Sequence, residues 1–356
     1  MRLDEPQWWY GDPQDVRGRL LAPLGRFYGW IAQSRFRRHQ PYRSRFPVIC
    51  IGNFTAGGTG KTPLAIATAR LLLARGESPV FLTRGYGGTA RAPIWVEDGP
   101  GAARRFGDEP LLLARVAPTL VSRDRRAGIC AIEEAGRKVS AVIMDDGLQN
   151  PTVAKDLSIA VVDGRRGLGN GEVIPAGPLR APIEFQLGLV DAIVVREPEG
   201  ASPDGRDIHE LLRRRFPGPV LAAHVIPSGD TSWLAGTPVV AFAGIANPER
   251  FYSLAESLGA RVVARVSFPD HHHISRADAG RLLGLAQTNK ARLLTTEKDW
   301  ARIAGDANAG GELLQKTQTL GIEMVFEERD LGRLVSLIEA AVQQQVYPRA
   351  ALPPQL

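Results

Sequence analysis

Short continuous apolar runs alternate with helix-like stretches through the first 200 residues of the chain. We predict strands at the apolar runs 48–51, 79–82, 119–122, 140–144, 159–162 and 192–195. Helices are predicted between them near residues 62–75, 109–116 and 124–136. Continuous apolar strands separated by helices are typical of a parallel sheet that is covered on both faces. The pattern therefore predicts an α/β fold with a mainly parallel sheet and helices on both faces.

A second, smaller α/β region is predicted in the remaining chain. Residues 197–206, rich in proline, glycine and charge, interrupt the first pattern. Further strands are predicted at 220–225, 239–243, 262–266, 293–295 and 323–326, and a closing helix at 331–344. We therefore expect an N-terminal segment over residues 1–40, a nucleotide-binding domain over 41–225 and a smaller C-terminal α/β domain over 226–356.

The N-terminal segment carries most of the chain's charge excess. Residues 1–46 hold nine arginines and four acidic residues, a net charge of +5 in a chain whose net charge is +6. The apolar stretch is too short to span a bilayer, and its acidic start does not suit a signal peptide. Large apolar side chains recur there at helical spacing, at Leu20, Leu24, Phe27, Tyr28 and Ile31. This amphipathic segment is suited to lie in a membrane interface. Packing of the helix on its own domain is the other interpretation. Binding of nucleic acid by the arginines is not favoured, because no recognition motif is present.

A glycine-rich loop follows the apolar run 48–51 and precedes the first predicted helix. Strand, glycine-rich turn and helix in this order are typical of a phosphate-binding P-loop, whose backbone N–H groups hold phosphate oxygens. Lys61 is expected to reach the β- and γ-phosphates, and the Thr62 hydroxyl to ligate Mg²⁺. The usual pattern begins with glycine, where this chain has Thr55. The predicted nucleotide-binding residues are Thr55, Ala56, Gly57, Gly58, Thr59, Gly60, Lys61 and Thr62.

Acidic residues supply candidate chemistry at two further places. The run 140–144 continues into Asp145 and Asp146, the form of a Walker B strand whose carboxylate binds Mg²⁺. An Asp-Gly turn is the alternative interpretation. Asp108 is expected to cap the helix near 109–116, and a carboxylate there is also a candidate base for an attacking hydroxyl.

Two other motifs invite a functional interpretation. His271, His272 and His273 are adjacent, and adjacent loop histidines rarely ligate one metal ion. One histidine polarised by a carboxylate is therefore the better functional interpretation. Solvated histidines without a functional role are the alternative. The sequence from Thr296 to Asp299 resembles a guanine-reading motif only superficially, because its lysine stands one place late. We infer no GTP specificity from it.

In order along the chain, these motifs resemble those of the tetraacyldisaccharide 4′-kinase family of lipid A biosynthesis. Asn150 departs from the family pattern, which has histidine there. The resemblance implies two α/β domains, with ATP bound by the first and the second closing over the site. It implies transfer of the ATP γ-phosphoryl group to the 4′-hydroxyl of a tetraacylated glucosamine disaccharide 1-phosphate, giving lipid IVA. The matching segments are 51–63, 83–88, 107–110, 144–149, 162–164, 167–171, 175–180, 242–248, 268–271 and 294–299.

The resemblance also implies residue roles. Lys61 and Thr62 act on phosphate and Mg²⁺, and Asp145 or Asp146 is the carboxylate on the metal side. Asp108 is the base, paired with His271. Further candidates for nucleotide or acceptor contacts are Glu109 and Arg180.

An acceptor with four acyl chains implies a peripheral enzyme on the cytoplasmic face of the inner membrane. Its partners are then the lipid surface and the acceptor, with no nucleic acid and no obligate protein partner. The alternative is a P-loop ATPase or GTPase that acts as a switch or as a metallochaperone, with His271–His273 as metal ligands and the basic N-terminus as a docking arm. An inactive binding module that keeps the fold is a third interpretation.

Overall fold

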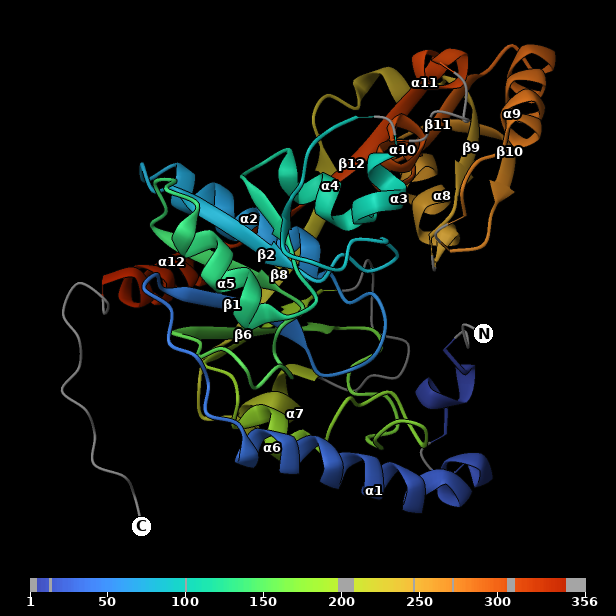
Figure 1. Cartoon of the computed structure of the whole chain (residues 1–356). Coiled ribbons are helices and arrows are strands. Elements are labelled where there is room, and N and C mark those ends of the chain that lie inside the picture. Colours follow the sequence, from blue (N-terminus) through green and yellow to red (C-terminus); the bar gives the residue numbers. More distant parts are fainter. Residues whose placement is uncertain are drawn as a thin grey trace. The chain divides into compact units, whose positions relative to one another are not determined.

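A computed structural model describes residues 5–12, 15–99, 101–197, 208–245, 247–270, 272–305 and 311–343 (Figure 1). The chain forms two compact units. Unit 1 comprises Met1–Thr83, Asp124–Val225 and Met324–Leu356, and unit 2 comprises Arg84–Arg123 and Ile226–Glu323. One limit between the units falls after Val225, the position of the predicted domain boundary. Residues 84–123 nevertheless belong to unit 2, and the chain from Met324 onward belongs to unit 1.

The core of unit 1 is a parallel sheet with the strand order β8-β7-β6-β1-β5-β2. The central strands are buried along their whole length, because their continuous apolar sequence suits a position with both faces covered. This confirms the predicted parallel α/β fold. The strands are β1 (Val48–Asn53), β2 (Pro79–Thr83), β5 (Ala141–Asp145), β6 (Leu157–Asp163), β7 (Ala192–Arg196) and β8 (Val220–Ser228).

Helices from three parts of the described chain pack on this sheet. Helix α2 (Lys61–Leu73) lies against β1, β2 and β5, α5 (Arg125–Glu134) against β2, and α12 (Glu328–Gln343) against β1 and β6. Since β1 and β5 are neighbours and parallel, the loops that follow them leave the same edge of the sheet. The other helical elements of unit 1 are η1 (Gln7–Tyr10), α1 (Val16–Arg38), α6 (Ile183–Leu187) and α7 (Ile208–Arg215).

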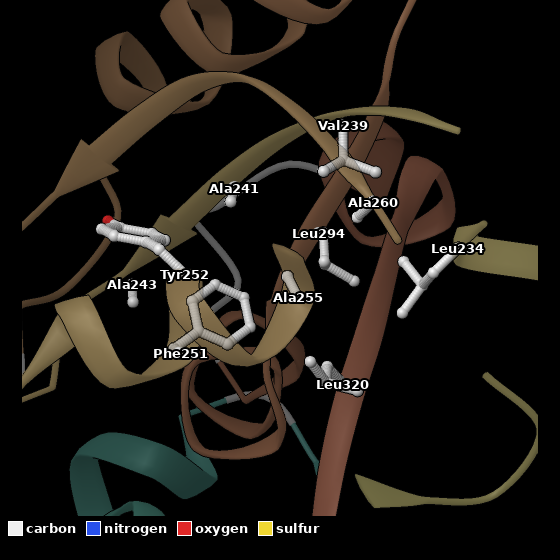
Figure 2. Packing of buried hydrophobic residues seen from close by; sticks show 10 residues of the cluster. All are labelled: Leu234, Val239, Ala241, Ala243, Phe251, Tyr252, Ala255, Ala260, Leu294 and Leu320. Atoms are coloured by element: carbon white, nitrogen blue, oxygen red, sulfur yellow. The ribbon is translucent and has the colours of Figure 1, made fainter. Parts of the chain in front are cut away.

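Unit 2 contains a smaller parallel sheet in the order β10-β9-β11-β12. Figure 2 shows Phe251 and Tyr252 of α8 packed with the small side chains of β9 and with Leu294 of β11 in one apolar cluster. The strands are β9 (Pro238–Ala243), β10 (Arg261–Ser267), β11 (Arg292–Thr296) and β12 (Thr317–Phe326). The helices from this part of the chain are η2 (Ser232–Leu234), α8 (Pro248–Ser257), α9 (Arg276–Thr288), α10 (Glu297–Ala304) and α11 (Gly311–Lys316).

The inserted segment of unit 2 contributes two short helices and an antiparallel pair of short strands. Helices α3 (Ala102–Phe106) and α4 (Asp108–Ala114) both pack on α10. The predicted strand at 119–122 is β4 (Thr119–Val121), and it pairs antiparallel with β3 (Ile94–Trp95). The β3–β4 pair is therefore an exception to the parallel pattern, which a short apolar run cannot reveal in advance.

Candidate active site

The glycine-rich loop connects β1 to α2 in unit 1, as a P-loop does. Gly57 and Gly60 have φ angles of +90° and +104°, which a residue with a Cβ adopts only with strain. Gly60 is the N-cap of α2, so the helix begins at Lys61. The backbone N–H groups of the first turn and the helix dipole therefore face the loop, where an anion is stabilised.

A second segment of unit 1 braces this loop. The backbone N–H of Ala56 donates to Pro178 O at 2.8 Å, and that of Arg180 donates to Phe54 O at 2.8 Å. Thr55 forms an isolated antiparallel bridge with Leu179. Thr55 thus has strand-like pairing, which gives a physical reason why glycine is not needed at the start of this loop.

Asp146, directly after β5, lies among cations. Arg180 Nη1 donates to Asp146 Oδ1 at 2.8 Å, and Lys61 Nζ lies 3.9 Å from the same oxygen. Arg180 Nε also donates to Thr55 O at 3.1 Å. Burial opposes ionisation of Asp146, but Lys61 and Arg180 outweigh it and hold the pKa of this carboxyl below its usual value. The structure therefore brings together four of the predicted site residues: Thr55, Lys61, Asp146 and Arg180.

Thr62 and Asp145 supply further oxygen donors in unit 1. Thr62 lies in the first turn of α2, and Asp145 is the last residue of β5. Both are buried. Hydroxyl and carboxylate oxygens are the donors that Mg²⁺ prefers, so these residues fit a nucleotide-associated magnesium ion. Over the described ranges of the chain, no group of three or more His, Cys, Asp and Glu residues is arranged to hold a metal ion by itself.

Glu5 also reaches the P-loop, which sequence patterns gave no reason to expect. A Cβ at Gly57 would overlap the Glu5 carboxylate, so this side chain lies directly on the loop. Arg166 Nη1 donates to Glu5 Oε2 at 2.7 Å, and the Tyr10 hydroxyl donates to the same oxygen at 3.1 Å. Burial, reinforced by Glu5, raises the pKa of Tyr10. An anion of the chain itself therefore lies on the phosphate-binding loop.

In unit 2, Asp108 is the first residue of α4, and its N-cap is Gly107 with a φ of +89°. The prediction that Asp108 caps this helix is therefore wrong. Its carboxylate instead accepts a 2.6 Å hydrogen bond from Arg302 Nη2 on α10. The two side chains are 3% and 4% exposed. Capping does not explain why an acid stands here, whereas a buried ion pair does.

Glu109, the next residue, also pairs with a cation on α10. Lys298 Nζ donates to Glu109 Oε1 at 2.7 Å, and Lys298 lies one helical turn before Arg302. Although burial opposes the charge of Lys298, Glu109 and Asp108 raise the pKa of this lysine above its usual value. Two cations on α10 thus hold two adjacent carboxylates on α4.

The histidine segment is only partly described, and His271 lies outside the described residues. His272 stacks on Phe268 with ring centroids 4.9 Å apart, and its Nε2 lies 3.1 Å from Asp278 Oδ2. Hydrogen bonds from Ser275 and then from His272 lower the pKa of Asp278 to about 2. His272 therefore packs beside the capping box at the start of α9.

Asn150, whose role the sequence left open, stabilises a turn. Its Oδ1 accepts hydrogen bonds from the backbone N–H of Thr152 at 2.9 Å and from the Thr152 hydroxyl at 2.7 Å. Lys155 Nζ donates to the Asn150 carbonyl oxygen at 2.7 Å. This arrangement is an Asx-turn, in which a short polar side chain holds the local backbone.

Helix α1 packs on unit 1 through glycines. Its buried residues are Gly18, Gly25 and Gly29, and a Cβ at Gly25 would lie 2.6 Å from Val173 O. No helix within the described residues is long and apolar enough to cross a membrane. Seven large apolar side chains of α1 lie on its outer side and are between 38% and 74% exposed, at Val16, Leu20, Leu24, Phe27, Tyr28, Trp30 and Ile31. Packing through small residues thus leaves an extended apolar face uncovered in unit 1.

Comparison with known proteins agrees with the motif pattern. A family model described as tetraacyldisaccharide-1-P 4′-kinase matches residues 17–340. A tetraacyldisaccharide 4′-kinase of Paramagnetospirillum magneticum is 48% identical over 85% of this chain and 90% of its own length. One from Methylobacterium nodulans is 47% identical over 94% of this chain and 95% of its own. A crystal structure of the LpxK protein of Aquifex aeolicus in complex with ATP superposes with a TM-score of 0.70 at 23% identity, over 91% of this chain and 99% of that one.

Proposed function

Because the chain belongs to the tetraacyldisaccharide-1-P 4′-kinase family, we propose that it transfers the γ-phosphoryl group of ATP to the 4′-hydroxyl of a tetraacylated glucosamine disaccharide 1-phosphate. The product is lipid IVA. One observation in unit 1 carries the proposal: the P-loop begins α2 at Lys61, beside the Asp146–Arg180 ion pair. This arrangement suits a triphosphate, because the loop supplies N–H donors and two cations neutralise phosphate charge.

Lys61 and Arg180 act on the phosphates in this proposal. Phosphoryl transfer requires mainly positioning and stabilisation of charge on the transferred oxygens. Asp146 holds both cations in place before the nucleotide binds, because its oxygen Oδ1 pairs with Arg180 and lies near Lys61. Charges that are held in advance need less reorganisation in the transition state.

Mg²⁺ would be held by Thr62 and Asp145. Asp146 suits this role less well, since its Oδ1 already accepts from Arg180 and a second positive charge, Lys61, lies near. When bound, the ion neutralises negative charge on the β- and γ-phosphates. The buried hydroxyl of Thr62 and the buried carboxylate of Asp145 supply hard oxygen ligands.

Asp108 acts as the general base on the acceptor hydroxyl in this proposal, with His271 as its partner. A buried carboxylate that is held by a fixed ion pair keeps one orientation, which a proton acceptor needs. Glu109 lies beside it in the sequence and is held by Lys298. We assign Glu109 to nucleotide or acceptor contacts.

The membrane contact is proposed for α1. Its outer side exposes Phe27 and Trp30, which stack with ring centroids 6.0 Å apart. Aromatic and aliphatic side chains beside arginines are typical of helices that lie in the headgroup region of a membrane. The acceptor carries four acyl chains, so a surface on the cytoplasmic face of the inner membrane would bring enzyme and acceptor together. The protein would then be peripheral.

The test is transfer of label. The protein is incubated with γ-³²P-ATP, Mg²⁺ and tetraacyldisaccharide 1-phosphate in mixed micelles, and the lipid and aqueous phases are counted. We expect label in the lipid, none in a reaction without acceptor, and none with Lys61→Met. Label that appears only as free phosphate would contradict the kinase assignment and favour an ATPase.

A further inference from the structure

We propose that Asp299 and Arg302, from the motif that begins at Thr296, are positioning residues that orient Asp108 and balance its charge. The inference rests on the proposed role of Asp108 as the base. It gives a function to the motif Thr296–Asp299, which neither the nucleotide nor the acceptor explains. All the groups concerned lie in unit 2.

Arg302 bonds to both carboxylates at once. Its Nη2 donates to Asp108 Oδ2 at 2.6 Å, and its Nη1 donates to Asp299 Oδ1 at 2.7 Å. The Arg302, Asp108 and Asp299 side chains are at most 4% exposed. A planar guanidinium that is fixed at both ends allows little rotation of the carboxylate bound to it.

Besides Arg302, two further groups hold the Asp299 carboxylate. Its Oδ1 accepts the Gly244 backbone N–H at 3.0 Å, and its Oδ2 accepts the Thr296 hydroxyl at 2.7 Å. Thr296 is the N-cap of α10, so the same residues start the helix and hold Asp299. The spacing of the motif, with the acid three places after the threonine, is what a capped first turn requires.

Arg302 also holds the backbone of the histidine segment. Its Nη1 donates to the carbonyl oxygen of His272 at 3.1 Å and lies 3.3 Å from that of Gly244. His272 directly follows His271, the proposed partner of Asp108. One guanidinium thus connects the candidate base, its charge-balancing acid and the segment that carries the histidine.

The charges explain why two acids share one arginine. An arginine paired with Asp108 alone would favour its ionised form strongly and make it a weak proton acceptor. The negative charge of Asp299 offsets part of the positive charge of Arg302. Burial raises the pKa of Asp299 above its usual value, although Arg302 opposes this. Lys298 also acts on Asp108, but it is paired with Glu109 and adds no net charge. Together with this pair, Asp108, Asp299 and Arg302 carry one net negative charge when the acids are ionised, and the group can accept one proton.

Substitutions of Asp299 and of Arg302 should shift the pH profile in opposite directions. Asp299→Asn removes a negative charge beside Asp108, so the pKa of Asp108 falls and the acid limb of kcat moves to lower pH. Arg302→Gln removes the positive charge, so the acid limb moves to higher pH. We expect both variants, and Arg302→Lys, to lower kcat about 10- to 100-fold, which is part of the roughly 10²- to 10⁴-fold that a general base contributes. The KM for ATP should change little.

The matched control is Arg265→Gln. Arg265 also bonds to two carboxylates in unit 2, those of Glu249 and Glu256, but at an exposed position. Circular dichroism and thermal unfolding select variants that fold. Arg302→Lys keeps the positive charge and Asp299→Asn keeps the shape of the side chain, so these two variants serve if Arg302→Gln does not fold. We expect Arg265→Gln to leave the pH profile unchanged.

Two results would overturn the inference. One is an unmoved acid limb in Asp299→Asn, and in Arg302→Gln where that variant folds, with activity falling only as the folded fraction falls. The other is a loss in Arg265→Gln as large as in Arg302→Lys. If Asp108→Asn itself keeps full turnover, the proposed base is wrong, and that result is separate from failure of the positioning role. Absence of label transfer in the unaltered protein would instead remove the proposed function.

Discussion

Asp108 and Arg302 are 194 residues apart in sequence and form a 2.6 Å buried ion pair. The pair joins residues 84–123, which follow β2, to helix α10, and both belong to unit 2. Breaking a buried pair by removing one partner leaves an uncompensated charge. The pair therefore constrains which substitutions can separate chemistry from stability.

Asp108→Asn tests the base with the smallest change of shape. We expect kcat to fall about 10²- to 10⁴-fold, because the amide cannot accept the hydroxyl proton. ATP affinity, measured by calorimetry, should stay within about twofold, since Asp108 is assigned no phosphate contact. Glu134→Gln, at an exposed position, is the control for loss of one acid. Undiminished turnover in Asp108→Asn would remove this residue from the chemistry.

Glu5→Gln tests the anion that lies on the P-loop. The carboxylate pairs with Arg166 and places a negative charge on the loop where phosphate would bind, so its neutralisation should tighten ATP binding. A partly exposed charge pair is worth up to about 1 kcal/mol, which corresponds to at most about fivefold in Kd. Calorimetric titration with a non-hydrolysable ATP analogue measures this change. Weaker binding would show that Glu5 supports the loop rather than competing with nucleotide.

Asp146→Asn tests the carboxylate between Lys61 and Arg180. The folded-state pKa of Asp146 is lowered, so its contribution to stability is fully present above the unfolded value of about 3.9 and is lost as the pH falls through the folded value. We expect the variant to be less stable at pH 7 by about 1 kcal/mol, since the group is partly exposed. The difference should narrow below about pH 4. Urea unfolding at several pH values measures it, and a difference that widens toward low pH would contradict the assignment.

Gly25→Ala tests how α1 is held. In a helix interior this change ordinarily stabilises by about 0.5–1 kcal/mol. Here the new Cβ would lie 2.6 Å from the Val173 carbonyl oxygen, so we expect a loss of about 1–3 kcal/mol instead. Leu24→Ala, on the exposed side of the same helix, is the control and should change stability by less than about 0.5 kcal/mol. A stabilised Gly25→Ala variant would mean that α1 does not pack through this glycine.

Trp30→Ala tests the proposed membrane face. An inserted large apolar side chain contributes about 1.5–3 kcal/mol, so partitioning to anionic vesicles should weaken about tenfold or more. Leu73→Ala removes an exposed apolar side chain at the end of α2 and should have no effect. Sedimentation with sucrose-loaded vesicles gives both values. Equal partitioning of Trp30→Ala and the unaltered protein would exclude this face.

Features that depend on neighbouring residues were accessible from the sequence. The apolar runs predicted β1, β5 and β6, because a buried parallel strand is apolar on both faces. The glycine pattern predicted the turn between β1 and α2, since positive φ angles require glycine. Family membership and the kinase class, inferred from the ordered set of motifs, are confirmed.

Features that depend on distant pairing were not accessible. Nothing near Asp108 in the sequence points to Arg302, and nothing near Gly57 points to Glu5. The assignment of residues 84–123 to unit 2 follows from packing of α3 and α4 on α10, which local periodicity does not encode. The signal available for Arg302 was its position three residues after the unexplained motif acid Asp299, one helical turn along the same face.

The most direct measurement locates the new phosphate on the product. The protein is incubated with ATP and tetraacyldisaccharide 1-phosphate, and the purified lipid is analysed by mass spectrometry and by ³¹P–¹H correlation NMR. We predict one added phosphomonoester whose phosphorus couples to the proton on C4′ of the distal glucosamine. Coupling to any other sugar proton, or an acceptor recovered unchanged while ATP is consumed, would contradict the assignment as a 4′-kinase.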